Sequence, residues 1–219
     1  MRITSLALTL LTAGIFTAQS AQAIIGMPSN SWEQQYSSIE DKDIPRTEES
    51  ALLSALQAAG ADTYKKLIVL DALINFYEER KKFSQEEKFV LQVIDVLKKD
   101  EEYPPILIAI QYMKLTTVAT NQNDLERARA YAQKASEIFI TECGSGSPEH
   151  AMALNNLGWV EFEMNHQKTA EHYFLRALDM IARTLGRQNV LYGVAAANLS
   201  DLYDKQHRPG LAQTWLKRS

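Results

Sequence analysis

The side chains that could perform chemistry are few and scattered along this chain of 219 residues. No two of its four histidines are four residues apart, the spacing at which one helix face presents two imidazoles to a metal ion. We expect two of them in turns between helices and two on helix surfaces: His166 and His207, and His150 and His172. The sequence therefore predicts no metal site.

The carboxylates also lack a catalytic arrangement. Asp41-Asp43 and Glu101-Glu102 form short runs, a pattern typical of solvated surface, whereas acid–base catalysis needs two carboxyl groups held at a fixed separation. A glycine-rich phosphate loop, a G-x-S-x-G elbow and an H-E-x-x-H pair are all absent from the sequence. We therefore predict no catalytic residues and no cofactor.

Cys143 is the only cysteine, so the chain forms no internal disulfide and its stability must come from packing. Two interpretations stay open. Cys143 is either a loop thiol without function, or a thiol that links two copies of the chain in an oxidising compartment.

Residues 1–23 have the composition of an export signal. Arg2 supplies a positive charge, residues 3–18 are apolar and small, and Ala21-Gln22-Ala23 matches the A-x-A cleavage pattern. The apolar run is shorter than the ~20 residues that a membrane-spanning helix needs. We predict cleavage after Ala23 and an exported protein, periplasmic or secreted, without stable membrane insertion; an uncleaved N-terminal anchor is the alternative.

Loss of Arg2 with this segment would change the formal net charge from −4 to −5. Nucleic-acid binding requires a basic stripe that neutralises phosphates. The most basic cluster, Arg80-Lys81-Lys82, directly follows Glu78 and Glu79, and we interpret it as a solvated helix end. The expected partner is therefore a protein or peptide and not a nucleic acid.

After the signal, residues 24–46 form a polar lead segment in which Trp32 and Tyr36 are possible anchors. From residue 47 to residue 219 apolar residues recur with helical spacing and never alternate, which predicts an all-α domain. Two starts carry capping patterns, Ser147-Pro148 and the capping box Ser84-Gln85-Glu86-Glu87. We expect helices at about 47–60, 62–82, 84–99, 106–121, 124–142, 148–164, 167–185, 190–206 and 210–218.

The helices pair, and the pairs recur every 42 residues. The recurring positions are Leu115, Leu157 and Leu199, then Ala128, Ala170 and Ala212, and the small residues Thr116, Gly158 and Ser200. Gly158 costs its helix ~1 kcal/mol relative to alanine, so we expect a close helix crossing there, with Ala170 as its counterpart. Because one pair cannot bury its apolar face alone, the pairs must stack into a solenoid.

In these residues the chain resembles the 42-residue variety of the tetratricopeptide repeat, as found in kinesin light chains and many bacterial proteins. The clearest unit contains Ala153-Leu154-Asn155-Asn156-Leu157-Gly158, Thr169-Ala170-Glu171 and Thr184-Leu185-Gly186. The resemblance covers residues 106–219 well and 63–99 weakly, and Ile74, Glu86 and Glu161 depart from its pattern. It implies an all-α, right-handed solenoid of about four antiparallel helical hairpins.

The resemblance also implies a binding surface, because the first helix of each pair lines the concave face that holds a peptide or partner helix. Asn156 and Asn198 are the strongest candidates, since an amide both donates and accepts hydrogen bonds. In the alternative interpretation the asparagines tie adjacent helices together and Trp159 packs within the stack. The lining residues carried over by position are Asn75, Lys114, Asn155, Asn156, Trp159, Asn198 and Asp201, with Asp71, Glu78, Met113, Thr117 and Met152 beside them.

Three functions follow from these observations. The first is a non-catalytic protein–protein interaction module, or adaptor, in the cell envelope. The second is a self-assembling structural envelope protein that forms a homodimer through Cys143 or through the C-terminal end, where Leu211, Trp215 and Leu216 lie near an uncovered face. In that region Trp215 is expected to pack inward on Leu199 and Leu202. The third and least favoured is an enzyme with an unrecognised site.

Overall fold

The computed structural model describes residues 49–218. The predicted export signal, the polar lead segment and the first residues of the expected helix at 47–60 lie outside this range. Every regular element within it is an α-helix, which confirms the all-α prediction. No helix among these residues is long and apolar enough to cross a membrane. The chain divides into two compact units, one ending at Tyr103 and one beginning at Pro104.

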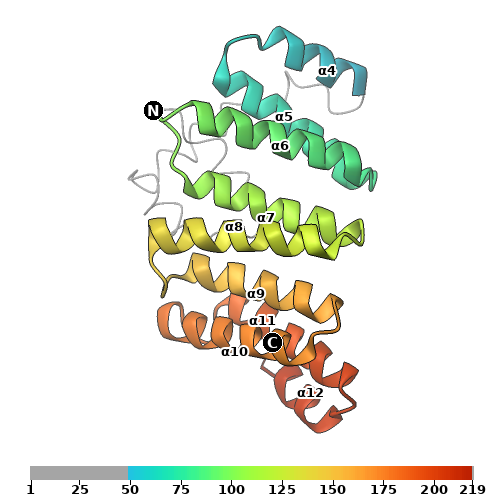
Figure 1. The fold of residues 1–219 in the computed structure, drawn as a ribbon, viewed down its shortest axis with the longest axis vertical. Coiled ribbons are helices and arrows are strands. Elements are labelled where there is room, and N and C mark those ends of the chain that lie inside the picture. Colours follow the sequence, from blue (N-terminus) through green and yellow to red (C-terminus); the bar gives the residue numbers. More distant parts are fainter. Residues whose placement is uncertain (1–48, 219) are drawn as a thin grey trace. The chain divides into compact units, whose positions relative to one another are not determined.

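The first unit contains α4 (Glu49–Ala58), α5 (Thr63–Glu79) and α6 (Phe83–Lys99) (Figure 1). Helix α5 packs against both α4 and α6. Its start is capped by Asp62, whose carboxylate accepts a hydrogen bond from the backbone N–H of Lys65 at 3.1 Å. The α5–α6 pair is a helical hairpin.

The capping box predicted at residues 84–87 is wrong. Helix α6 begins at Phe83, so Ser84 already lies inside the first turn and cannot cap it. The residue at the cap position is Lys82, whose side chain makes no capping hydrogen bond. Glu86 and Glu87, which the box would have placed at the helix start, are buried.

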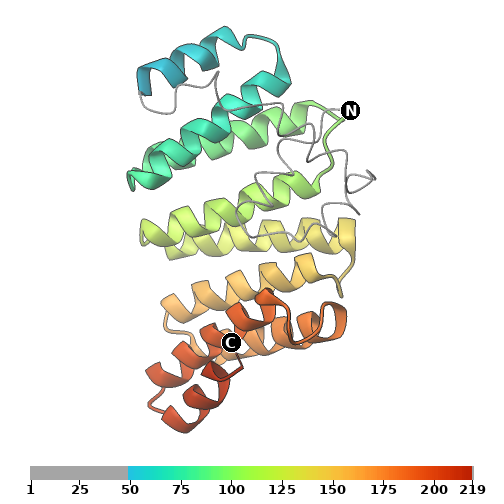
Figure 2. The same ribbon diagram turned by 180° about the vertical axis from the view of Figure 1, so that it is seen from behind.

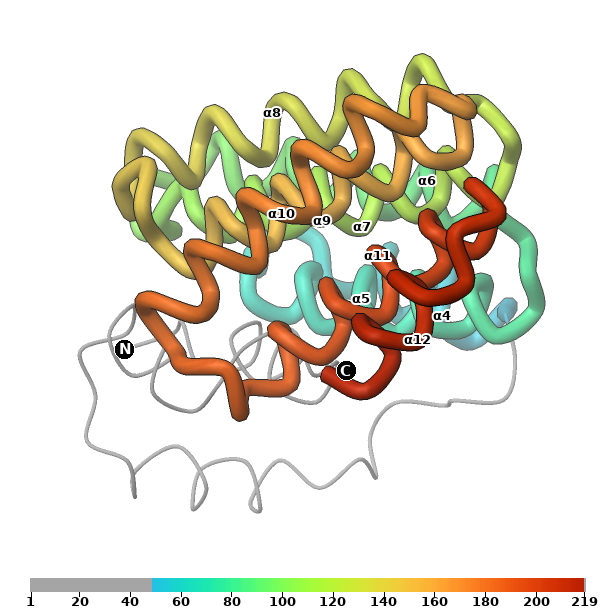
Figure 3. The backbone as a smooth tube through the Cα atoms, turned by 90° about the horizontal axis from the view of Figure 1, so that it is seen from below, coloured from blue at the N-terminus to red at the C-terminus, as the bar shows by residue number. Residues whose placement is uncertain are grey.

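The second unit contains three antiparallel hairpins in chain order, α7–α8, α9–α10 and α11–α12 (Figures 1 and 2). Viewed along the stack, α10 crosses α8 obliquely, so successive hairpins are rotated relative to one another (Figure 3). This arrangement confirms the predicted solenoid of stacked helix pairs. The helices are α7 (Ile106–Asn121), α8 (Leu125–Cys143), α9 (Pro148–Glu163), α10 (Gln167–Thr184), α11 (Val190–Lys205) and α12 (Pro209–Leu216).

The turn inside each hairpin contains one residue with left-handed backbone, and these residues are spaced by 42. They are Lys81, Asn123, Asn165 and His207, with φ between 53° and 64°. Asparagine adopts this conformation more readily than most residues, which suits it to two of the four turns. The second helix of every hairpin begins two residues later. The α5–α6 hairpin therefore keeps the period of the repeat although its side chains resemble the repeat only weakly.

The loops between hairpins of the second unit also recur. Gly144 and Gly186 have φ of +92° and +84°, a region that glycine enters without steric cost. The following helices are capped by side chains: Ser147 accepts from the N–H of His150, and Asn189 accepts from the N–H of Leu191. Pro148 takes the first helical position of α9, as the sequence predicts.

The leucines and alanines that define the period are buried in the second unit. At the small-residue position, a Cβ added to Gly158 would lie 2.6 Å from Cδ1 of Phe174 on α10. The counterpart of Gly158 is therefore Phe174, and the prediction of Ala170 is wrong. Ala170 is fully buried one turn earlier on α10, but it is the Phe174 ring that fills the space above the glycine.

This contact predicts that Gly158→Ala destabilises the protein. Alanine is the better helix former by ~1 kcal/mol, but its methyl group collides with a fully buried ring, and overpacking of this kind costs ~1–3 kcal/mol. We expect a net loss of free energy of unfolding, measured by urea denaturation. Gly210→Ala on α12 is the matched control, because no atom lies within 4 Å of the added Cβ. Equal stability of the Gly158→Ala protein and the unmodified protein would contradict the assignment.

Candidate functional site

Two positions of the 42-residue period carry most of the predicted binding residues on α7, α9 and α11. The first position holds Lys114, Asn156 and Asn198, and the second holds Thr117, Trp159 and Asp201. The two positions are three residues apart, so they lie on one face of each helix. Since α9 contacts both α7 and α11, these two positions recur on neighbouring helices, and we call the six residues the first-helix row.

Three members of the first-helix row keep polar atoms available to solvent. Thr117 and Asp201 are exposed. Asn156 is half-buried, and its side-chain amide forms no hydrogen bond with another described residue. Partial desolvation of its carboxyl group against the helix, with a smaller contribution from Asp204, raises the pKa of Asp201 above its ordinary value. The row thus presents polar groups to solvent, among them a carboxylate that gains a proton more readily than usual.

Two other predicted residues are joined across the stack. The amide nitrogen of Asn198 on α11 donates a hydrogen bond to the amide oxygen of Asn155 on α9 at 2.9 Å. This bond matches the interpretation in which asparagines tie adjacent helices together. Of the asparagines in the second unit's predicted site, Asn156 is the one whose side chain forms no hydrogen bond with another residue of the part of the chain that the structure describes.

The remaining candidates differ in their exposure. Trp159 is half-buried and packs against the core, with its ring 5.3 Å from that of Phe162. Lys114 is half-buried on α7. Met113 and Met152, which were expected to lie beside the site, are buried.

Asn75 lies on α5 in the first unit, so it belongs to a different compact unit from the first-helix row. It is exposed and donates a hydrogen bond to the carboxylate of Asp71 at 3.3 Å, one turn earlier on the same helix. Glu78 is exposed near the end of that helix.

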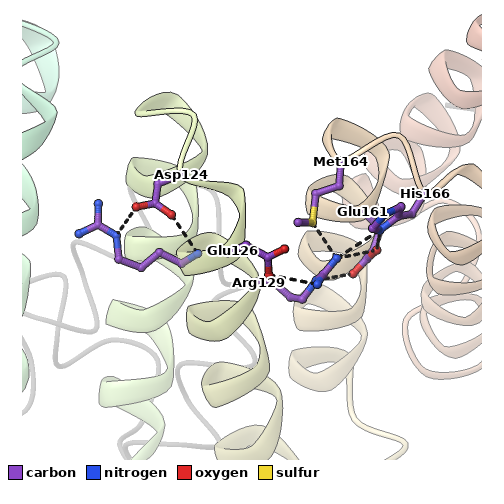
Figure 4. Close-up of polar contacts among 7 residues, drawn as sticks. Asp124, Glu126, Arg129, Glu161, Met164 and His166 are labelled. Carbon is purple, nitrogen blue, oxygen red and sulfur yellow. Dashed lines mark hydrogen bonds and ion pairs between the residues drawn. The ribbon is translucent and has the colours of Figure 1, made fainter.

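A buried ion pair that the sequence did not suggest joins the first two hairpins of the second unit (Figure 4). The guanidinium of Arg129 on α8 donates two hydrogen bonds to the carboxylate of Glu161 on α9, at 2.8 and 3.3 Å. His166 Nδ1 lies 2.7 Å from the same carboxylate, so its N–H donates to it in the matching tautomer. Arg129 also contacts Glu126 at 3.2 Å. Glu161 is only 8% exposed and is satisfied by these partners.

The α9–α10 and α11–α12 hairpins are joined by a hydrogen bond at the equivalent positions of the repeat. Tyr203 on α11 donates a hydrogen bond to Glu171 on α10 at 2.6 Å. Glu171 stands one period after Arg129, and Tyr203 one period after Glu161, so both bonds join residues 32 apart. Burial and the bond to Glu171 raise the pKa of Tyr203 to about 12. We call these two contacts the inter-repeat ties.

One sequence signal could have revealed the ties. Glu161 is a charged residue at a position where the repeat pattern carries an aromatic, and a buried charge requires a partner. The contact partner is found only by aligning successive repeats. Arg129 then aligns with Glu171, and Glu161 aligns with Tyr203, so one pair of positions carries complementary side chains in both repeats.

The histidines lie partly as expected. His166 and His207 occupy the turns between paired helices, and His172 is exposed on α10. His150 is instead buried at the start of α9, where its Nδ1 lies 2.7 Å from the carbonyl oxygen of Ser145 and helps to fix the α8–α9 loop. Within the described chain, no group of three histidine, cysteine, aspartate or glutamate side chains could hold a metal ion.

Cys143 ends α8 and is half-buried. Burial raises the pKa of its thiol to about 11, and the nearby carboxylates of Glu149 and Glu142 add to the effect. Because the thiolate is the reactive form, this environment disfavours disulfide exchange at neutral pH.

Residues 108–181, which include nearly all of α7 to α10, match the family model described as tetratricopeptide repeat. This part of the chain consists of tetratricopeptide repeats. The match covers the ion pair between Arg129 and Glu161, the contact of Gly158 with Phe174, and the α7 and α9 part of the first-helix row. A search of curated proteins finds no match to the chain.

Solved structures share the fold. BtubC (BKLC) from P. vanneervenii is 19% identical, with a TM-score of 0.64 over 77% of this chain and 68% of that one. The apo form of RapI is 17% identical, with a TM-score of 0.63 over 77% of this chain and 46% of that one. A putative kinesin light chain from Podosopora anserina with nearly identical repeats is 13% identical, with a TM-score of 0.60 over 98% and 90%. The chain thus shares its fold with a putative kinesin light chain.

The buried ion pair predicts a measurable coupling free energy between Arg129 and Glu161. A double-mutant cycle with Arg129→Gln and Glu161→Gln should give a coupling free energy of ~1–3 kcal/mol, since Glu161 is buried and bound in two places. The matched cycle with Glu126→Gln should give less than ~0.5 kcal/mol, because Glu126 is 75% exposed. Both coupling free energies are measured by denaturant unfolding. Equal values from the two cycles would show that burial of Glu161 does not strengthen its interaction with Arg129.

The raised pKa of Cys143 predicts slow chemistry at neutral pH. The thiolate fraction at pH 7 falls by about a hundredfold when the pKa rises from 9.0 to about 11. Reaction with an aromatic disulfide reagent should therefore be slow at pH 7 and accelerate by about tenfold per pH unit up to about pH 10. A rate at pH 7 equal to that of a free cysteine peptide would contradict the assigned environment.

Proposed function

We propose that this protein is a non-catalytic adaptor of the cell envelope that binds a protein partner along the first-helix row. The tetratricopeptide fold is that of a protein–protein interaction module. The observation that carries the proposal is the set of solvent-available polar groups at the two row positions of three neighbouring helices, with Thr117 on α7, Asn156 on α9 and Asp201 on α11.

The chemistry of the row favours an extended peptide or a partner helix with exposed polar groups. The free amide of Asn156 can donate to a carbonyl and accept from an N–H, so it recognises backbone as well as side chains. The bond between Asn155 and Asn198 supports this role, because it fixes the spacing of α9 and α11 on which such groups stand. A rigid scaffold lowers the entropy lost when the partner binds.

Export is proposed from residues 1–23, whose charge, apolar run and A-x-A pattern are those of a secretion signal. A partner of the mature protein would then be periplasmic or extracellular. The proposed location of the adaptor is therefore the cell envelope.

Site-specific photo-crosslinking tests the binding surface in the native cells. A benzophenone amino acid replaces Thr117 or Asp201, both exposed and in the row, and the matched controls replace Gln133 on α8 or Arg176 on α10, both exposed on second helices. We expect a discrete crosslinked product in the envelope fraction from the row positions only. Asn156→Ala in the same protein should reduce that product by at least about fivefold, while helicity by circular dichroism stays unchanged.

Crosslinks of equal yield from the row and from the second helices would contradict the proposal, and so would a product unaffected by Asn156→Ala. Product in the cytoplasmic fraction alone would contradict the proposed location while leaving the binding surface in place.

A further inference from the structure

A second surface lies at the start of α11, outside the first-helix row. The end of α12 returns beside α11 (Figures 1 and 3), and the two segments enclose an open hollow of about 870 Å³. Its lining includes three basic residues and three small apolar ones, and we call it the basic hollow: Arg187, Lys217, Arg218, Val190, Val194 and Ala197. Its volume falls in the range of roughly 300–1,000 Å³ typical of ligand pockets.

Apolar side chains in the basic hollow are unusually open to solvent. Val190 is 67% exposed and Val194 is 48% exposed, one turn apart on the same face of α11. Leu216, next to Lys217, is 61% exposed. Val190 and Val194 thus have two of the three largest exposed fractions among the large hydrophobic residues of the described chain, which marks an interaction surface.

The charge of the basic hollow is of one sign. Among the described residues no carboxylate lines the hollow, and neither Arg187 nor Lys217 forms an ion pair with another of them. Arg218 lies over the ring of Trp215, 4.7 Å from its centroid, which holds that cation in place. The hollow also receives the positive end of the α11 dipole, whose first turn contains no acidic residue. These charges stand out on a chain whose net charge is −4.

We propose that the basic hollow binds a short acidic segment of a partner protein, with carboxylates beside Arg187, Lys217 and Arg218 and an apolar side chain on Val190 and Val194. Exposed apolar floor and unpaired cations occur together, which matches a peptide that carries both kinds of side chain. A polynucleotide or an anionic membrane needs a broader basic surface than three cations on an acidic protein. The proposal rests on the adaptor function and specifies the chemistry of its partner.

Selection from a random octapeptide library displayed on phage tests the hollow with the purified full chain. We expect enrichment of sequences that contain at least two aspartates or glutamates around a valine, leucine, isoleucine or phenylalanine. The enriched peptide, labelled with a fluorophore, should lose at least about tenfold in affinity for the Arg187→Glu, Lys217→Glu variant. Raising the salt concentration from 50 to 500 mM should weaken binding of the peptide to the unmodified protein, because salt screens the attraction between opposite charges.

The matched control is Lys168→Glu, Arg176→Glu, which makes the same change in net charge at two exposed residues of α10. It should change the affinity by less than about twofold. The neutral variant Arg187→Gln, Lys217→Gln should fall between the unmodified and reversed proteins, which keeps the test valid if charge reversal disturbs folding.

Three results would overturn the inference: no acidic enrichment, equal loss of affinity in the control variant, or binding of phosphatidylserine vesicles that depends on Arg187 and Lys217 while peptides do not bind. Failure of the adaptor function is distinguishable. If the peptide does not bind but the unmodified protein still gives the crosslinked product of the first-helix row, the proposal for the hollow is wrong and the adaptor function stands. If the unmodified protein gives no crosslinked product but still binds the acidic peptide, the adaptor function is wrong and the binding chemistry of the hollow stands.

Discussion

The stacking of the second unit depends on how closely the two helices of a hairpin approach. At the centre of the unit this approach is set by Gly158, whose missing side chain leaves room for the ring of Phe174. Phe174 is fully buried and belongs to a core cluster that also contains Leu199 and Leu202 of the next hairpin. One glycine thus lets a large apolar ring reach from its own hairpin toward its neighbour. The third hairpin uses a different contact at the same position, where Ser200 donates to the carbonyl oxygen of Ala212 at 2.9 Å.

Apolar packing holds the hairpins together. It does little to favour one order of hairpins along the stack over another, because the buried leucines and alanines are the same in each hairpin. The inter-repeat ties differ. Arg129 faces Glu161 at the first junction, whereas Glu171 faces Tyr203 at the second. A glutamate at position 203 would place two carboxylates together, which is unfavourable in a half-buried site. The pairs therefore favour one order of hairpins over its permutations, in the way polar groups specify register elsewhere.

Two surfaces remain once the core and the ties are satisfied, and their chemistry is distinct. The first-helix row is nearly neutral and offers amide, hydroxyl and carboxyl groups, which suits contact with a peptide backbone. The basic hollow combines cations with exposed valines and suits an acidic side chain next to an apolar one. Both include residues of α11, where Val190 begins the helix and Asp201 lies three turns later.

The sequence by itself determined the helices, their pairing and the 42-residue period, because these depend on local spacing of apolar residues, turns and caps. It also identified Leu157, Ala170 and Gly158 as positions of close packing. The partners of those positions were decided only by the tertiary structure. Phe174 instead of Ala170 fills the space over Gly158. Glu161, at a position where the repeat pattern has an aromatic residue, forms an ion pair with Arg129.

The contact partners could not be read from the sequence because the contacts join residues that are far apart along the chain. Asn155 and Asn198 are 43 residues apart, and Arg129 and Glu161 are 32 apart, so no local pattern of residues encodes either contact. The basic hollow unites residue 187 with residues 217 and 218 only because α12 folds back on α11. Local periodicity fixes which residues are buried in a helix, whereas the crossing of the helices decides which side chains meet.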